Sequence, residues 1–453
     1  MTPLAFFAVA LALVVFSLVS KKAERGVVTP PMVFAGLGFA LGAGGFGLLN
    51  VTVPNAALNT LAEVTLALTL YTDASRIDPT RLGREHDLPL RLLGVGLPLT
   101  MLAGFGLALV LLPAAGLVGA ALLAIALAPT DAALGQAVVS NEAVPPRISQ
   151  AINVESGLND GLAFPALVVL ASFATEEASR GIAGWLGFLS AQIVLGPLVG
   201  LAVGYVGARL IEAASEHGDV EATFLRLGSV ALAILAYAGA ECIGGNGFLA
   251  AFAGGLMAGA RSDRLRAAVG DFAEAEGQLR ALIVFLLFGA VLLPSVLGGE
   301  AGEEAEGWLD LWQVGWPAVA YALLSLTVVR MVPVALCLIG ARLRPSTVLF
   351  VGWFGPRGLA SIIYLLILLD EYALDRAERI APTVLLTVAL SIVLHGVTAA
   401  PLARAYGRAM KAAEERKPVS GFPTKTRPAS LLRDRRGGPR DSSDRAGGTP
   451  AAP

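Results

Sequence analysis

The sequence has 453 residues, of which 55% are hydrophobic and only 15% are charged, and its mean hydropathy is +0.71. This composition excludes an ordinary soluble domain and is typical of a polytopic membrane protein built from bundled helices. The near-neutral net charge of −2 argues against a nucleic-acid partner. Cys242 and Cys337 lie far apart in apolar segments, so we expect neither a disulfide framework nor a metal site.

Apolar stretches of about twenty residues, the length needed to cross the hydrocarbon core, recur along most of the chain. We predict about thirteen spans, near residues 3–20, 27–48, 51–75, 89–113, 116–139, 150–174, 182–211, 223–242, 245–260, 279–298, 311–341, 346–369 and 381–404. The basic residues of the first span follow its apolar run, so we expect an uncleaved helix there and not a signal peptide.

The distribution of Lys and Arg predicts the orientation in the membrane. Basic residues concentrate in the loops after odd-numbered spans, such as Arg342 and Arg344, whereas the loop from Glu300 to Asp310 is acidic. Because basic loops remain in the cytoplasm, we expect the N-terminus outside the plasma (inner) membrane and the C-terminus inside. Residues 408–453 have few apolar side chains, so we expect a disordered cytoplasmic tail after a membrane domain formed by residues 1–407.

Two acidic residues lie inside adjoining predicted spans, where an ionisable group is costly and usually serves transport. Asp131 follows Pro129 and Thr130 in the fifth span, and Asp160 lies in the sixth. Since Pro129 removes a helix hydrogen bond, we expect an unwound segment whose free carbonyl groups can bind a cation.

The sixth span arranges its polar residues on neighbouring helix faces. Ser156 and Asp160 are four residues apart and share one face, and Glu155 and Asn159 share the next. One face can therefore supply oxygen ligands to an ion while the other braces it.

The twelfth span contains a second set of helix breakers. Glycines and Pro356 surround Arg357 in the sequence G-W-F-G-P-R-G, so we expect this helix to be interrupted as well. Spans four to six and eleven to thirteen have opposite predicted orientations, which indicates an inverted-repeat transporter whose site lies where the breaks meet. A buried arginine needs a carboxylate partner, and we expect Glu155 to pair with Arg357.

Four motifs together resemble those of the monovalent cation:proton antiporter-1 family, the sodium/proton antiporters of NhaP and NHE type. They are P-T-D at 129–131, E-S-G-L-N-D-G at 155–161, G-N-G-F-L-A-A at 245–251 and G-W-F-G-P-R-G at 352–358. The resemblance covers the membrane part of the chain and excludes the tail. It implies an all-α antiporter fold with two discontinuous crossing helices, in spans five and twelve.

The resemblance also implies an ion site. Asp160 matches the essential ion-binding aspartate, Asp131 and the Thr130 backbone match the unwound-helix ligands, and Ser156 matches a hydroxyl ligand. Asp73 falls where relatives often have a glutamate near the ion.

Three further positions match residues that organise this site. Asn159 before Asp160 resembles the form associated with electroneutral exchange. Glu155 and Arg357 match a buried pair that also holds Asn159.

The family further implies a homodimer that serves pH homeostasis. A moving core, spans near 89–174 and 311–404, would slide against an interface formed by spans near 3–75 and 223–298. The motif favours Na⁺ or Li⁺ as the transported ion, with K⁺ as the competitor, and no cofactor is expected beyond the cation and the proton.

A desolvated carboxylate binds either a proton or a cation, so competition at Asp160 would couple the two fluxes. Two other classes place acids in membranes. A cation channel would lack proton coupling, and an intramembrane aspartyl protease would be expected to carry Tyr-Asp and Gly-x-Gly-Asp motifs, which are absent here. For His395 we favour a packing role over a proton relay.

Overall fold

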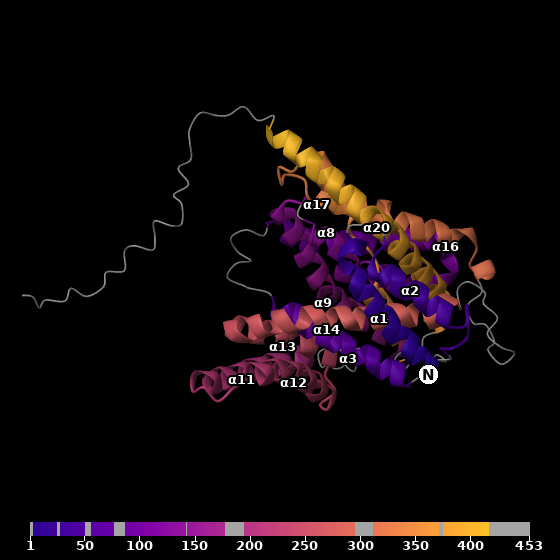
Figure 1. The fold of residues 1–453 in the computed structure, drawn as a ribbon. Helices are drawn as coiled ribbons and strands as arrows, with labels where there is room; N and C mark the ends of the chain where they lie inside the picture. Colours follow the sequence, from indigo (N-terminus) through magenta and orange to yellow (C-terminus); the bar gives the residue numbers. More distant parts are fainter. Residues whose placement is uncertain are drawn as a thin grey trace, which may run out of the picture. The chain divides into compact units, whose positions relative to one another are not determined.

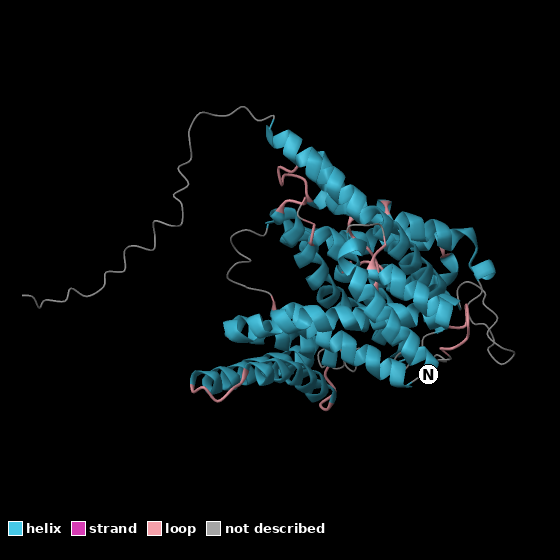
Figure 2. Cartoon of the chain, in the orientation of Figure 1, coloured by secondary structure: helices cyan, strands magenta, loops and turns pink. Residues whose placement is uncertain are grey.

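The computed structural model describes residues 3–24, 28–49, 56–76, 87–141, 143–176, 194–294, 311–370 and 375–415. Within these ranges the chain is helical and contains no strand (Figure 2). Every predicted span overlaps at least one described helix, which confirms the all-α prediction. The acidic loop 300–310 and the tail from residue 416 onward lie outside the described residues.

The first half of the chain contains the following helices (Figure 1): α1 (Pro3–Glu24), α2 (Pro30–Leu41), α3 (Ala56–Ser75), α5 (Asp87–Arg91), η1 (Leu92–Gly96), α6 (Leu97–Leu111), η2 (Pro113–Ala115), α7 (Gly116–Ala126), α8 (Ala132–Val139), α9 (Pro146–Glu176) and α11 (Gly196–Glu216). The second half contains α12 (Ala222–Glu241), α13 (Gly247–Arg261), α14 (Asp263–Leu287), η4 (Phe288–Leu292), α16 (Leu311–Leu326), α17 (Val328–Cys337), α18 (Pro345–Trp353), α19 (Leu359–Asp370) and α20 (Asp375–Glu415).

Six of the described helical segments are long and apolar enough to cross a membrane. They differ in how much of the apolar stretch is buried inside the chain, from 17% in Gly196–Glu216 to 67% in Arg379–Ala412. Since the exposed apolar side chains of α11 require a hydrocarbon environment, this helix lies at the periphery. Because two thirds of its apolar stretch is buried inside the chain, α20 lies near the centre of the helix bundle.

Glycines allow α13 to approach two other helices at the backbone. A Cβ atom at Gly200 of α11 would overlap the main chain of Ala250, and one at Gly255 of α13 would overlap the main chain of Tyr71 in α3. Small residues at helix contacts are typical of membrane bundles, where close packing replaces the hydrophobic driving force. Figure 1 shows α11, α12 and α13 side by side.

Both predicted helix interruptions are present. The fifth span breaks between the end of α7 at Ala126 and the start of α8 at Ala132, and the twelfth breaks between Trp353 and Leu359. The two breaks contact each other, since the main-chain N–H of Asp131 donates to the carbonyl of Pro356 at 2.8 Å. The prediction of two discontinuous crossing helices is therefore confirmed.

Candidate functional site

A cavity of about 400 Å³ lies beside the first break. Its lining comes from α3, α8, α9, α14 and α20, from Thr29 and the first two residues of α2, and from the first residue of α19. Four of the predicted site residues line it, namely Asp73, Asp131, Ser156 and Asp160. The structure therefore brings three carboxylates and a hydroxyl, from α3, from α9 and from the break before α8, to one cavity.

Asp160 lies near the middle of α9 and is 8% exposed. Its Oδ1 atom is buried and has no hydrogen-bond partner. Its main-chain carbonyl accepts a hydrogen bond from the hydroxyl of Tyr364 at 2.7 Å, which ties α9 to α19. A buried carboxylate oxygen without a donor is costly unless it holds a proton or a cation, so this atom is suited to bind either one.

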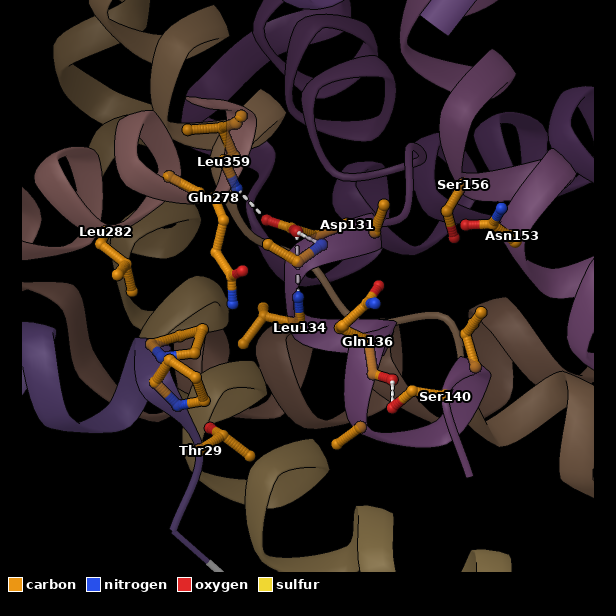
Figure 3. A pocket seen from close by; sticks show the side chains of 18 of the residues that line it. Thr29, Asp131, Leu134, Gln136, Ser140, Asn153, Ser156, Gln278, Leu282 and Leu359 are labelled. Carbon is orange, nitrogen blue, oxygen red and sulfur yellow. Dashed lines mark hydrogen bonds between the residues drawn. The ribbon is translucent and has the colours of Figure 1, made fainter. Parts of the chain in front are cut away.

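Asp131 caps two half-helices at once. Its Oδ1 accepts the N–H groups of Ala133 at 2.6 Å and Leu134 at 3.1 Å, at the start of α8. Its Oδ2 accepts the N–H of Leu359, the first residue of α19 (Figure 3). Because a carboxylate offers roughly four acceptor positions, these three bonds leave Asp131 limited capacity for a cation.

The hydroxyl of Thr130 connects the first break to α9. It lies 2.9 Å from the hydroxyl of Ser156 and accepts a hydrogen bond from Asn159 Nδ2 at 2.6 Å. Thr130 and Asn159 do not line the cavity, and Asn159 Oδ1 has no partner. The amide of Asn159 is thus held by Thr130 and not by the predicted ion pair.

The prediction of an ion pair between Glu155 and Arg357 is wrong. Glu155 pairs instead with Arg330 of α17, with Oε1 2.5 Å from Nη1 and Oε2 2.7 Å from Nη2, and both side chains are at most 2% exposed. The two parallel contacts satisfy the planar guanidinium and the carboxylate together. Arg330 was detectable in the sequence as an ionisable residue inside an apolar span, which marks a functional or paired group.

Arg357 binds carbonyl groups, and among the described residues no carboxylate forms an ion pair with it. Its Nη1 donates to the carbonyl oxygens of Ala128 and Pro129, the latter at 2.9 Å. These carbonyls follow the C-terminal end of α7, where a helix carries partial negative charge. The cation of Arg357 and the carboxylate of Asp131 thus neutralise opposite helix ends at the crossing, and Arg357 occupies two carbonyls that were predicted to be free for an ion.

Asp73 reaches the cavity from α3. Its carboxyl carbon is 3.9 Å from the position that a Cβ atom would take at Gly157, one residue after Ser156. Asp73 therefore lies on the same side of α9 as the lining residues.

Residues 8–405 match the family described as sodium/hydrogen exchanger, transmembrane. The chain is 26% identical over 398 residues to the K(+)/H(+) antiporter NhaP of Alkalimonas amylolytica, covering 86% of this chain and 64% of that protein. It is 27% identical over 240 residues to the K(+)/H(+) antiporter NhaP2 of Shewanella oneidensis, covering 52% and 38%. The chain thus spans less than two thirds of the length of these relatives.

A solved structure shares the fold. The sodium proton antiporter MjNhaP1 from Methanocaldococcus jannaschii matches with a TM-score of 0.68 at 22% identity, over 89% of this chain and 98% of that one. The fold predicted from the motifs is therefore confirmed.

Proposed function

The chain belongs to the sodium/hydrogen exchanger transmembrane family, and on that premise we propose that it exchanges a monovalent cation for a proton across the membrane. The family consists of transporters and not enzymes. The observation that carries the proposal is the buried, unpartnered Oδ1 of Asp160 in a cavity that also contains Asp73 and Asp131. An oxygen in this position gains from binding either a proton or a cation, and the binding of one displaces the other.

Because a proton and a cation compete for Asp160, their movements across the membrane are coupled without a separate coupling element. We infer that the transition between the two sides takes place only when Asp160 is neutralised by a proton or a cation, because moving an uncompensated charge through the hydrocarbon region is costly. Ser156 supplies a hydroxyl ligand beside it, and Asp131, Asp73 and the Thr130 backbone complete the proposed ligand set. Glu155, paired with Arg330, and Arg357 brace the helices around the ion.

Two observations favour different transported cations. The motifs P-T-D and N-D favour Na⁺ or Li⁺, whereas the curated relatives are named as K⁺/H⁺ antiporters. We propose Na⁺ or Li⁺ as the first candidate and K⁺ as the second. Because Asn159 precedes Asp160 where an electrogenic relative would carry a second aspartate, we propose that the exchange is electroneutral.

The cavity also supports a division into two parts. Asp131, Ser156 and Asp160 come from the spans near 89–174, whereas Asp73 comes from the spans near 3–75. We infer that the first group, with spans near 311–404, moves as a core against the second group and spans near 223–298. The latter would form the contact of a homodimer, with the C-terminus of each chain in the cytoplasm.

Proteoliposomes that contain a trapped pH dye test the proposed function directly. Imposed gradients of Na⁺, Li⁺ or K⁺ are expected to drive proton movement with the wild type and not with Asp160→Asn. Asp263→Asn is the matched control, because that side chain is 89% exposed at the start of α14. A wild type that moves no protons, as a channel would, or an Asp160→Asn variant with normal coupling would overturn the proposal.

A second measurement in the same vesicles tests electroneutrality. Clamping the membrane potential at different values is expected to leave the initial exchange rate unchanged. A rate that follows the potential would contradict one-for-one exchange.

A further inference from the structure

Helix α20 presents a polar face to the second break although most of the helix is apolar. Ser391, His395 and Thr398 are spaced four and three residues apart and so lie on one side of the helix. Ser391 and His395 are at most 1% exposed. Neither lines the cavity, to which α20 contributes only Gly396, Ala399 and Ala400.

Ser391 and His395 bind opposite ends of the break. The main-chain N–H of Arg357 donates to Ser391 Oγ at 2.7 Å, just before α19. His395 Nε2 lies 3.0 Å from the carbonyl oxygen of Trp353, the last residue of α18. Since a carbonyl can only accept, this contact is a hydrogen bond in the tautomer that carries its proton on Nε2.

The two side chains also contact each other. His395 Nδ1 lies 3.2 Å from Ser391 Oγ and 3.1 Å from the carbonyl oxygen of Ser391. In the tautomer with the proton on Nε2, the hydroxyl of Ser391 accepts from Arg357 and donates to Nδ1. The indole of Trp353 lies against the imidazole, with ring centroids 5.1 Å apart, and its Nε1 donates to Thr398 at 3.0 Å. Each donor in this chain of contacts meets an acceptor.

The break needs these partners because its main chain lies outside any helix. An unpaired N–H or C=O group at this depth carries a large desolvation penalty. The main chain that Ser391 and His395 bind leads directly to the first break. The side chain of Arg357 binds carbonyl groups of that break, and the N–H of Leu359 binds Asp131. Any shift of Arg357 is therefore passed to Asp131, which lines the cavity.

We propose that Ser391 and His395 are positioning residues for the cation site, a role that rests on the proposed function. They fix the main chain from Trp353 to Arg357, so that Leu359 and Arg357 hold Asp131 and the carbonyls of the first break in the arrangement that binds the ion. They contact neither the ion nor the proton in transit.

The test compares Ser391→Ala and His395→Leu with Thr387→Ala. Thr387 is a buried residue one turn before Ser391, and its hydroxyl binds only its own helix, at Thr383. Both break-facing variants are expected to raise the cation concentration for half-maximal exchange by about fivefold or more, because each leaves a buried group of the break unpaired. The maximal exchange rate of these two variants is expected to change by a smaller factor than the half-maximal concentration. Thr387→Ala is expected to change the half-maximal concentration by less than about twofold.

Two readouts separate positioning from general stability. Ser391→Thr and His395→Gln, which keep a hydroxyl and a donor, are expected to restore the half-maximal concentration. Hydrogen exchange of a peptide covering residues 354–360 is expected to quicken in Ser391→Ala and not in Thr387→Ala.

The inference is overturned if Ser391→Ala and Thr387→Ala behave alike in both readouts, or if Ser391→Thr fails to rescue. A wild type that drives no proton movement in the same vesicles would instead refute the proposed function, so the two failures are distinguishable.

Discussion

The carboxylate of Asp131 accepts a hydrogen bond from the main-chain N–H of Leu359, 228 residues later in the chain. A side chain from the first broken helix thereby caps a half-helix of the second. In the opposite direction, the guanidinium of Arg357 from the second break binds two carbonyls of the first. The breaks form one unit, so a change in either alters the geometry of the cavity lined by Asp131 and Asp160.

Removal of the Asp131 carboxylate is expected to destabilise the fold and to impair transport. Asp131→Ala leaves the N–H groups at the starts of both α8 and α19 without acceptors, and we expect a loss of about 2 to 4 kcal/mol in the free energy of unfolding. Asp131→Asn keeps one acceptor oxygen for α8 and loses the acceptor for Leu359, so its loss is intermediate. Unfolding in detergent followed by tryptophan fluorescence measures this order, and equal stabilities of Asp131→Asn and the wild type would contradict it.

Gly358 is required by the close approach of the two breaks. A Cβ atom at this position would overlap Asp131 Oδ2, which is held by Leu359 and cannot move without losing that hydrogen bond. We expect Gly358→Ala to lower the melting temperature and to abolish most of the exchange activity. Gly135→Ala is the matched control, because that glycine in α8 has no atom within 4 Å of an added Cβ. A Gly358→Ala variant as stable as Gly135→Ala would contradict the observed contact.

The partner of Glu155 can be identified by a double-mutant cycle. Glu155→Gln and Arg330→Met each leave a buried partner uncompensated, and we expect each to reduce the free energy of unfolding by about 3 to 5 kcal/mol. The two changes together are expected to be less harmful than their sum by roughly 1 to 3 kcal/mol. Unfolding in mixed micelles of increasing SDS content measures the cycle.

The same cycle between Glu155 and Arg357 serves as the comparison. Its coupling is expected to be smaller, because these side chains form no ion pair. A larger coupling with Arg357 than with Arg330 would restore the pairing expected from the sequence.

The two native cysteines report the orientation of the chain. Cys242 is exposed at the end of α12, whereas Cys337 is buried in α17. With the N-terminus outside, Cys242 lies on the outer side, and a membrane-impermeant maleimide added to intact cells is expected to label it. Cys242→Ser should remove this labelling, and labelling that appears only in inside-out vesicles would reverse the predicted topology.

Both helix breaks could be predicted from the sequence because proline and glycine act through the local backbone. Pro129 and Pro356 lie inside the observed interruptions, and the motif residues around them lie at the crossing. The convergence of Asp131 and Asp160 on one cavity also agreed with their positions in adjoining spans.

The pairing of side chains could not be predicted in the same way. The sequence offers Glu155 two arginines inside apolar spans, and the choice of Arg330 depends on where the fold places α17 relative to Glu155. The close approach of Gly355 to the guanidinium of Arg330 similarly depends on tertiary packing. Hydrogen-bond partners that are 175 or more residues apart leave no local pattern in a single sequence.

Proton release on cation binding tests the shared site at Asp160 most directly. When Na⁺, Li⁺ or K⁺ is added to purified protein in a weakly buffered solution below the pH at which Asp160 is already ionised, about one proton per chain is expected to appear for each cation bound. The release should vanish in Asp160→Asn and persist in Asp263→Asn. Cation binding at this pH that releases no proton, or release that is undiminished in Asp160→Asn, would contradict competition at a single carboxylate.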